Sequence, residues 1–325
     1  MTSAAFDVLG IGNAIVDVIT HADDSFLTKH ALVKGSMTLI DEARAETLYG
    51  AMGPGVEISG GSCGNTIAGV ASFGGKGAYV GKVRNDQLGA VFGHDLRATG
   101  VTFDTAQATE GPSTARCLIV VTPDAQRTMN TYLGACTRLG PSDIDVAQVA
   151  AAQVTYVEGY LWDPPEAKKA VLKAFDAAHA AGRKVSITLS DSFCVDRYRD
   201  EFRALIRDKV DILFANESEI KSLYQVDSFE AALAAARAEN KICALTRSEK
   251  GSVVIKGSET HAVPAAPVAR VVDTTGAGDL YAAGFLFGFT HGKPLAECAR
   301  LGGIAAAEVI SHVGARPEKA LKGLI

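Results

Sequence analysis

Several features are missing from this 325-residue sequence, and each absence argues against a class of protein. No uninterrupted apolar stretch approaches the ~20 residues of a membrane-spanning helix. The first residues lack the basic and apolar segments of a signal peptide. The net charge is −5 and there is no dense run of lysine and arginine, so a nucleic-acid-binding surface is not expected. We expect a cytoplasmic protein that acts on a small molecule, with no membrane or nucleic-acid partner.

Metal-binding cysteine motifs and two common nucleotide-binding motifs are also missing. The six cysteines are widely spaced, with no C-x-x-C pair and no histidine at a metal-ligand spacing. We expect reduced thiols in packed positions, although Cys63 lies in a glycine-rich segment and could belong to a site. The P-loop pattern G-x-x-x-x-G-K-S/T is absent, and the segment 10–15 lacks the third glycine of a dinucleotide-binding fingerprint.

What is present is the composition of an ordinary folded protein, with 47% hydrophobic and 21% charged residues. Strand-like and helix-like segments alternate in the second half of the chain. The expected strands are 154–162, 184–190, 211–217 and 241–248, and the expected helices include 164–182, one through Arg203 and Leu205, and one near 231–238. Such alternation predicts βαβ units, and hence a doubly wound α/β fold with a mainly parallel sheet and helices on both faces.

The first half of the chain departs from this rhythm. Residues 6–19 form a β-branched run that predicts a first, buried strand. Residues 20–40 and 101–133 contain short strand-like runs between polar turns, and we expect a small accessory sheet, or lid, from them. Because no linker or change of composition divides the chain, residues 1–325 are predicted to form one domain with a discontinuous lid.

The most specific segment is DTTGAGD at 273–279, which directly precedes a helix-like run at 280–289. Glycines at a helix start let an anion approach the free backbone N–H groups at the positive end of the helix dipole. Asp279 would then lie in the first turn, where a carboxylate can take the proton of an attacking hydroxyl. The alternative is a plain glycine turn in which Asp279 only interacts with the helix dipole.

DTTGAGD resembles the C-terminal signature of the PfkB/ribokinase family of carbohydrate and nucleoside kinases, and other segments resemble that family in the expected order. The resemblance implies a ribokinase-like fold, transfer of a phosphoryl group from ATP to a hydroxyl with Mg²⁺, and in many relatives a monovalent cation such as K⁺. In the implied mechanism the loop stabilises the transferring phosphoryl group while Asp279 deprotonates the acceptor. The implied loop residues are Gly276, Ala277 and Gly278 for catalysis, Thr275 for ATP or the cation, and Asp273 for the cation.

The segment 60–68, GGSCGNTIA, resembles the N-terminal signature of the same family, in which glycines and an asparagine bind the hydroxyls of the sugar. The resemblance implies that Gly61 and Asn65 bind the acceptor. Glycine permits close approach of the backbone, and the Asn65 amide offers both a donor and an acceptor to a hydroxyl. Alternatively, Ser62 or Asn65 only caps a helix.

Gly12-Asn13 followed by Asp17 resembles the first strand of the family, in which an aspartate accepts hydrogen bonds from two adjacent sugar hydroxyls. Asn13 and Asp17 are therefore implied as acceptor-binding residues. A carboxylate in so apolar a strand is costly unless it is paired or faces a ligand. The alternative is an aspartate that lies in solvent at a strand end.

Two further segments resemble the nucleotide side of the family's site. NESE at 216–219 matches an N-x-x-E motif, which implies that Asn216 contacts ATP and that Glu219 holds Mg²⁺ through water; without the resemblance it is a helix cap with an acidic first turn. The segment 246–251 resembles a T-x-G-x-x-G loop in which Ser248 replaces the first glycine. Thr246 and Gly251 are implied as ATP contacts, although the segment could be only a turn between strands.

Within the family, the segments GNAIVDV, SFLTKHALVKGSM, GGSCGN and SITLSDSF most resemble adenosine kinases. This favours phosphorylation of the 5′-hydroxyl of a ribonucleoside, adenosine to AMP in particular. Arg127 falls where such kinases place a lid arginine near the substrate and its phosphates. Leu161 stands where a phenylalanine is expected against the purine; Tyr160 or Trp162 could take its place, or could equally pack in the core.

Two rival interpretations stay open. A sugar kinase acting on ribose, fructose or a related sugar would carry the same core motifs. A catalytically silent binding or regulatory protein could keep the same fold, although retention of Asp279 and the complete glycine loop speaks against it. The sequence does not predict an oligomeric state.

Overall fold

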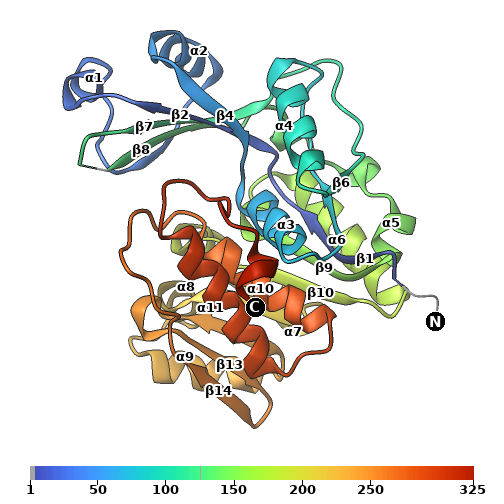
Figure 1. Ribbon diagram of the computed structural model, residues 1–325. Coiled ribbons are helices and arrows are strands. Elements are labelled where there is room, and N and C mark those ends of the chain that lie inside the picture. Colours follow the sequence, from blue (N-terminus) through green and yellow to red (C-terminus); the bar gives the residue numbers. More distant parts are fainter. Residues whose placement is uncertain (1–3, 125) are drawn as a thin grey trace.

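The computed structural model describes residues 4–124 and 126–325, and it confirms the predicted α/β fold with a small second sheet (Figure 1). Residues 1–3 and 125 of the predicted single domain lie outside the described residues. Within the described residues the large sheet has nine strands in the order β14-β13-β12-β11-β10-β9-β1-β5-β6. From β6 to β12 neighbouring strands pair in parallel, and the hairpin β13–β14 continues the sheet antiparallel to β12. The strands are Phe6–Ile11 (β1), Gly77–Val80 (β5), Thr102–Phe103 (β6), Ala152–Glu158 (β9), Lys184–Thr188 (β10), Ile212–Asn216 (β11), Ile242–Thr246 (β12), Ser252–Lys256 (β13) and Glu259–Val263 (β14).

Helices cover both faces of this sheet, as predicted. One face carries α3 (Ser62–Ser72), α4 (Gln87–Ala98), α10 (Ala277–Thr290) and α11 (Leu295–Val309). The other carries α5 (Val146–Ala150), α6 (Pro165–Ala180), α7 (Ser192–Asp208), α8 (Glu217–Tyr224) and α9 (Phe229–Ala238). A Cβ atom at Gly69 would lie 2.6 Å from the Cβ of Ala283, so α3 and α10 pack very closely. This packing brings the N-terminal ends of the two helices together.

The small sheet has the strand order β3-β8-β7-β2-β4. Its strands are Ile15–His21 (β2), Met37–Leu39 (β3), Gly55–Ser59 (β4), Ala115–Val121 (β7) and Arg127–Tyr132 (β8). Helices α1 (Asp24–Lys29) and α2 (Glu42–Ala51) lie on the side away from the main body (Figure 1). Ala45 and Leu48 of α2 pack with Val16, Val18 and Leu118, which occupy one face of the sheet. The other face is therefore free to turn toward the large sheet.

The prediction of one strand over residues 6–19 was wrong. The chain leaves the large sheet after Ile11 and enters the small sheet at Ile15 as β2. At the break, the backbone N–H of Asn13 donates to the Glu158 carboxylate (2.9 Å) instead of to a neighbouring strand. A Cβ atom at Gly12 would lie 2.5 Å from that carboxylate, so only glycine fits. Hydrophobic periodicity cannot reveal that two consecutive apolar runs belong to different sheets.

Two other boundaries differ from the expectation. The strand expected over 154–162 ends at Glu158, and residues 159–162 form a short 3-10 helix. The small sheet also uses residues outside the expected ranges 20–40 and 101–133, since it includes β2 from Ile15 and the whole of β4, whereas the pair Thr102–Phe103 joins β5 in the large sheet. We propose that the small sheet with α1 and α2 forms the lid.

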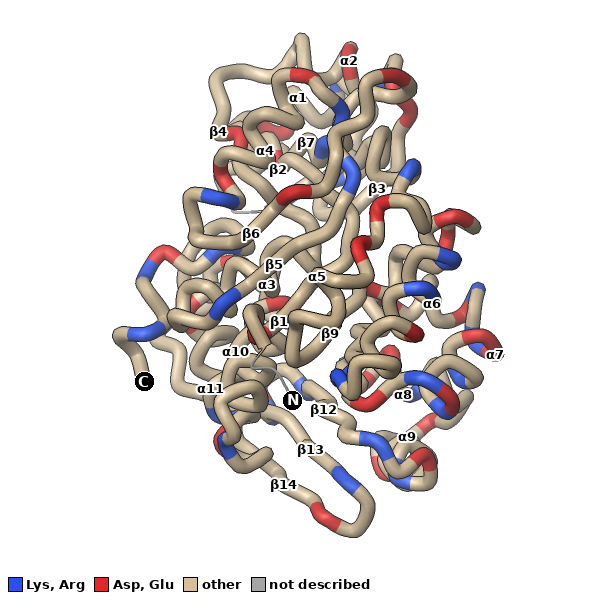
Figure 2. Tube along the Cα trace, turned by 90° about the vertical axis from the view of Figure 1, so that its right-hand side faces the viewer, with Lys and Arg blue, Asp and Glu red and all other residues tan. Residues whose placement is uncertain are grey.

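Basic and acidic residues alternate over the whole molecule. Figure 2 shows Lys and Arg interspersed with Asp and Glu along the described trace, from α1 and α2 at one end to β13 and β14 at the other. Among the described helices, none is both long enough and apolar enough to cross a membrane.

Candidate active site

The loop that precedes α10, residues 273–276, ends at a helix start where the sequence predicts that an anion binds, and we call it the anion loop. Gly276 has a left-handed backbone (φ 78°), and a Cβ atom there would lie 2.8 Å from the Cβ of Ala315. Ala277 and Gly278 begin the helix, and among the described residues no atom outside the adjoining backbone lies within 4 Å of the Cβ position of Gly278. The first N–H groups of a helix have no intrahelical partner and point toward such open space. An anion can therefore approach the backbone here.

Asp279 lies in the first turn of α10 and is held by two side chains from α3. Ser62 Oγ donates to its Oδ1 (2.7 Å), and Asn65 Nδ2 donates to its Oδ2 (3.0 Å). Burial raises the pKa of Asp279 above its usual value, while these two hydrogen bonds and the charge of Arg316 lower it in part. A raised pKa makes the carboxylate a stronger base, which suits proton abstraction from a hydroxyl.

The turn before α3 brings the predicted acceptor residues together. Gly61 has a φ of 81°, and a Cβ atom there would lie 2.4 Å from the carbonyl oxygen of Asn13. A Cβ atom at Gly60 would lie 2.5 Å from the Asp17 carboxyl group. These glycines let the turn lie directly against Asn13 and Asp17. Ser62, which the sequence suggested only as a helix cap, contacts Asp279 instead of capping α3.

Asp17 projects from β2 into a cavity of about 670 Å³ that Asn65 and Arg316 also line. In the described part of the chain no group donates a hydrogen bond to its carboxylate. Burial raises its pKa to about 6, against the opposing charges of Arg127 and Arg316. Asp17 is thus a desolvated carboxylate with both oxygens available to a ligand.

Strand register places Asp17 in a row that crosses the small sheet. Side chains of directly paired residues lie on the same face of a sheet. Asp17 pairs with Ile58 on one side and with Cys117 on the other, Cys117 pairs with Thr131, and Thr131 pairs with Leu39. Because α2 covers the opposite face, this row faces the main body. Away from Asp17 the row is mostly apolar.

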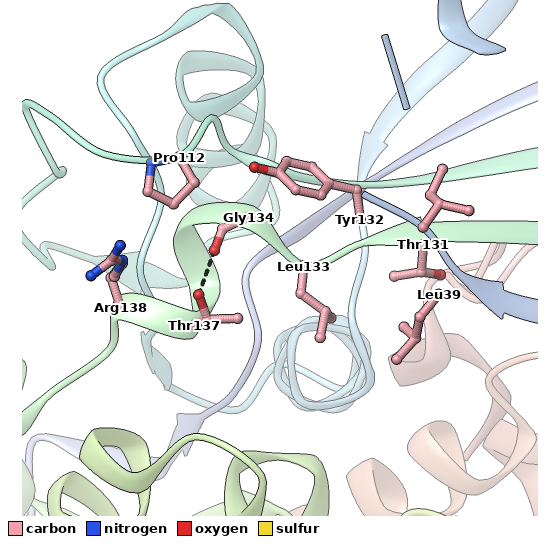
Figure 3. A pocket seen from close by; sticks show the side chains of 9 residues that line it. Leu39, Pro112, Thr131, Tyr132, Leu133, Gly134, Thr137 and Arg138 are labelled. Atoms are coloured by element: carbon pink, nitrogen blue, oxygen red, sulfur yellow. Dashed lines mark hydrogen bonds between the residues drawn. The ribbon is translucent and has the colours of Figure 1, made fainter. Parts of the chain in front are cut away.

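The far end of this row borders a second cavity, of about 440 Å³. In Figure 3 the side chains of Leu39, the last residue of β3, and Leu133, which directly follows β8, both extend toward the helices of the main body. Thr137 lies at another wall, where its hydroxyl donates to the carbonyl oxygen of Gly134 (2.7 Å). The lining is mixed, with apolar side chains such as Leu39 and Leu133 beside polar ones such as Thr137 and Arg138.

Trp162 packs in the core and does not line the second cavity. Its ring packs against Phe202, its Nε1 donates to Glu201 (3.0 Å), and it is almost fully buried in the cluster on the other face of the sheet. Leu161 is buried in the same cluster. Trp162 and Leu161 are therefore core residues. Tyr160 is only partly buried, and its hydroxyl lies 3.5 Å from the carbonyl oxygen of Ser190.

The predicted nucleotide residues lie on the other side of the Gly276 loop. A cavity of about 650 Å³ is lined by Asn216, Thr246 and Gly251 together with Ala277 and Gly278. A smaller one, of about 220 Å³, reaches from there to Ser62, Glu219 and Asp279. Gly251 has a φ of 80°, so the loop after β12 turns at the predicted glycine. The smaller cavity thus connects the predicted nucleotide residues with the carboxylate of Asp279.

Glu219 is buried and forms a capping box with Asn216. Its Oε2 accepts from the Asn216 backbone N–H (2.9 Å), and its Oε1 accepts from the Asn216 side-chain amide (2.6 Å). Burial raises its pKa to about 7. Glu219 and Asp279 line the same small cavity. One or two carboxylates beside a phosphate site is a donor set that fits Mg²⁺ with retained water.

Asp273 is fully engaged by other groups. Its Oδ1 accepts from the backbone N–H and hydroxyl of Thr275 (3.0 and 2.7 Å). Its Oδ2 accepts from the backbone N–H of Gly314 (2.9 Å) and forms a buried ion pair with Arg127. The structure thus brings Arg127 of the lid strand β8 to the anion loop. Thr274, the neighbour of Thr275, lines both nucleotide-side cavities.

Sequence reasoning missed Glu158, at the end of β9. Its carboxylate is buried and accepts from the backbone N–H groups of Asn13 (2.9 Å) and Cys63 (2.9 Å). Burial raises its pKa to about 7. Glu158 therefore joins the end of β1 to the start of α3, the two segments next to which the predicted acceptor residues lie. The signal that identified Asp17, a carboxylate in an apolar strand, was also present here.

Replacing Glu158 by glutamine is expected to lower the free energy of unfolding by about 1–3 kcal/mol, because the amide can accept from only one of the two N–H groups and presents a donor to the other. Urea unfolding at neutral pH would measure the change. The surface variant Glu166→Gln is the matched control and should stay within about 0.5 kcal/mol of wild type. A Glu158→Gln protein as stable as the control would contradict this role.

Known proteins resemble this chain over most of its length. A model of the pfkB family carbohydrate kinases matches residues 37–320. The chain belongs to this family. Two solved structures resemble this PfkB kinase over 99% of its length and 98% of theirs: a probable sugar kinase from Rhizobium etli CFN 42 (55% identity, TM-score 0.92) and an adenosine kinase from Sinorhizobium meliloti (56% identity, TM-score 0.91). Adenosine kinase 1 of Arabidopsis thaliana is 27% identical over 98% of the chain and 99% of the relative. The names of these relatives leave two acceptor classes, nucleoside and sugar.

Proposed function

We propose that this PfkB kinase transfers the γ-phosphoryl group of ATP to the 5′-hydroxyl of a ribonucleoside, adenosine in particular, and so forms AMP and releases ADP. One observation carries the choice of a nucleoside: the register row from Asp17 to Leu39 joins a ligand for sugar hydroxyls to a second cavity that presents the apolar side chains of Leu39 and Leu133. A nucleoside needs both surfaces, because its ribose is polar and its base is flat and largely apolar. A free sugar would leave the second cavity in contact with water.

In the proposed reaction, Asp17 and Asn65 fix the ribose so that its primary hydroxyl points at Asp279. Asp279 takes the hydroxyl proton, and Ser62 and Asn65 hold the carboxylate in place through their hydrogen bonds. The backbone N–H groups at Gly276, Ala277 and Gly278 stabilise the charge of the transferring phosphoryl group.

ATP would occupy the cavity lined by Asn216, Thr246 and Gly251, with its phosphates toward the loop. Glu219 would hold Mg²⁺ through water, and Mg²⁺ would neutralise part of the phosphate charge. Arg127 lies beside the loop, where a guanidinium suits phosphate oxygens. A monovalent cation such as K⁺ near Asp273 and Thr275 stays a prediction.

A steady-state assay with adenosine, guanosine, inosine, ribose and fructose tests the proposal. Adenosine should have the highest kcat/KM, about 10²-fold above ribose, since burying roughly 100 Å² of base is worth about 2.5 kcal/mol. Leu39→Ala should reduce kcat/KM for adenosine and leave that for ribose unchanged. If ribose or fructose equals adenosine, the sugar-kinase alternative replaces the proposal. If no acceptor is phosphorylated, the protein is a silent member of the fold.

A further inference from the structure

Arg316 lies in the loop that follows α11, a segment to which the sequence assigned no function. This loop is fastened at several points. The backbone N–H of Gly314 donates to Asp273, and Ala315 packs against Gly276. Glu308 Oε1 accepts from the backbone N–H groups at positions 318 and 319 (3.1 and 3.0 Å). Arg316 is therefore presented by a backbone that is tied both to α11 and to the anion loop.

The Arg316 guanidinium forms hydrogen bonds with the last residue of the lid strand β4. Its Nε and Nη2 donate to the carbonyl oxygen of Ser59 (3.1 and 2.8 Å), and Nη2 also donates to the Ser59 hydroxyl (3.0 Å). Ser59 in turn donates to Asp95 of α4 through its N–H (2.8 Å) and its hydroxyl (2.6 Å). Ser59 directly precedes Gly60, the residue that lies against Asp17. Arg316 thus fixes the turn that closes over the acceptor carboxylate.

The charge of Arg316 is available to the site. Its Nη1 is buried and has no hydrogen-bond partner among the described residues, and Arg316 lines the same cavity as Asp17 and Asn65. Within those residues it forms no direct ion pair with any carboxylate, and its positive charge acts through space on three of them, Asp95, Asp17 and Asp279. It lowers the pKa values of both Asp17 and Asp279, against the larger effect of burial.

Other groups face these two carboxylates. Asp17 is faced by Arg127 of β8, Cys117 of β7, Arg316 and Asp279. Asp279 is faced by Ser62, Cys63 and Asn65 of α3, Tyr156 and Glu158 of β9, Tyr160, Glu219 of α8 and Arg316. Arg127 is already paired with Asp273. Arg316 is therefore a cation whose charge acts on both site carboxylates. Among the described residues it has no carboxylate in a direct ion pair.

We propose that Arg316 is a positioning residue for phosphoryl transfer: it holds the Gly60–Gly61 turn through Ser59 and supplies the positive charge that compensates Asp17 and Asp279. The proposal rests on the proposed function, in which an ionised Asp17 accepts hydrogen bonds from the acceptor hydroxyls. An ionised carboxylate accepts these bonds more strongly than a protonated one.

The test is the pH dependence of kcat/KM for the acceptor, which reports groups of the free enzyme. The assay uses the acceptor that wild type phosphorylates best. Activity should fall on the acidic side, because protonation of Asp17, whose pKa is about 6, removes its acceptor oxygens, and protonation of Asp279, whose pKa burial also raises, removes the proposed base. Loss of the Arg316 charge raises the pKa of Asp17. In Arg316→Gln the acidic limb should therefore shift to higher pH by about 0.5–1 pH unit. Arg316→Lys keeps the charge and should keep the limb at the wild-type pH.

Arg237→Gln is the matched control, since Arg237 also donates to a carbonyl oxygen, that of Gly257, but lies on α9. Its acidic limb should equal that of wild type. A wild-type limb in Arg316→Gln, or equal shifts in the lysine and glutamine variants, would overturn the role of the charge. If the glutamine variant does not fold, the lysine variant decides, and any shift of its limb counts against the proposal. Failure of the proposed function differs from all of these, because it shows in wild type itself: ribose or fructose then equals adenosine as acceptor, or no acceptor is phosphorylated.

Discussion

Replacing Asp279 with asparagine is expected to reduce kcat by at least ~10²-fold in a chain that stays folded. The amide cannot take the proton of the attacking hydroxyl. It can still accept one of the two hydrogen bonds from Ser62 and Asn65, so the start of α10 should remain in place. Steady-state kinetics at saturating ATP would measure the loss of kcat, and calorimetric titration of ATP would show that the nucleotide side is intact.

Ser62→Ala is the natural comparison for this variant. It removes one hydrogen bond from Asp279 and leaves the carboxylate, so its loss of kcat should be much smaller than that of Asp279→Asn. The order of the two effects separates proton transfer from mere placement of the side chain. Near wild-type turnover by a folded Asp279→Asn protein would show that another group is the base.

Local structures that depend on residues adjacent in the sequence could be predicted from the sequence. The segment 273–279 forms the expected glycine loop at a helix start, and the turn at 60–61 lies against Asn13 and Asp17. In both cases the geometry depends on local backbone freedom, which glycine signals directly. The parallel sheet could be predicted for a similar reason, because strands and helices alternate within short stretches of chain.

Features that depend on contacts distant in sequence could not be predicted. Arg316 reaches Ser59 across 257 positions, and Glu158 reaches Asn13 across 145. Neither contact leaves a periodic or compositional trace. The break between β1 and β2 has the same origin, since an apolar run looks alike whether it continues one sheet or enters another. The burial of Trp162 followed from the end of β9 at Glu158, and strand ends are weakly specified by sequence.

In the proposed function, binding of the acceptor depends on the carboxylate of Asp17. We expect Asp17→Ala to weaken acceptor binding by about 10²-fold, the value of two hydrogen bonds to a charged group at ~1.5 kcal/mol each. ATP binding should be nearly unchanged, because Asn216, Thr246 and Gly251 line a different cavity. Calorimetric titration of each ligand separately measures both affinities.

Asp176→Ala on the surface of α6 is a suitable control and should alter neither affinity. Because Asp17 receives no hydrogen bond from the described residues and burial raises its pKa, its removal should not destabilise the unliganded protein, so a loss of acceptor binding cannot be blamed on unfolding. Equal losses of both affinities would place Asp17 in the general architecture of the site. Loss of neither would remove it from the acceptor pocket, and the row from Asp17 to Leu39 would then no longer support a nucleoside.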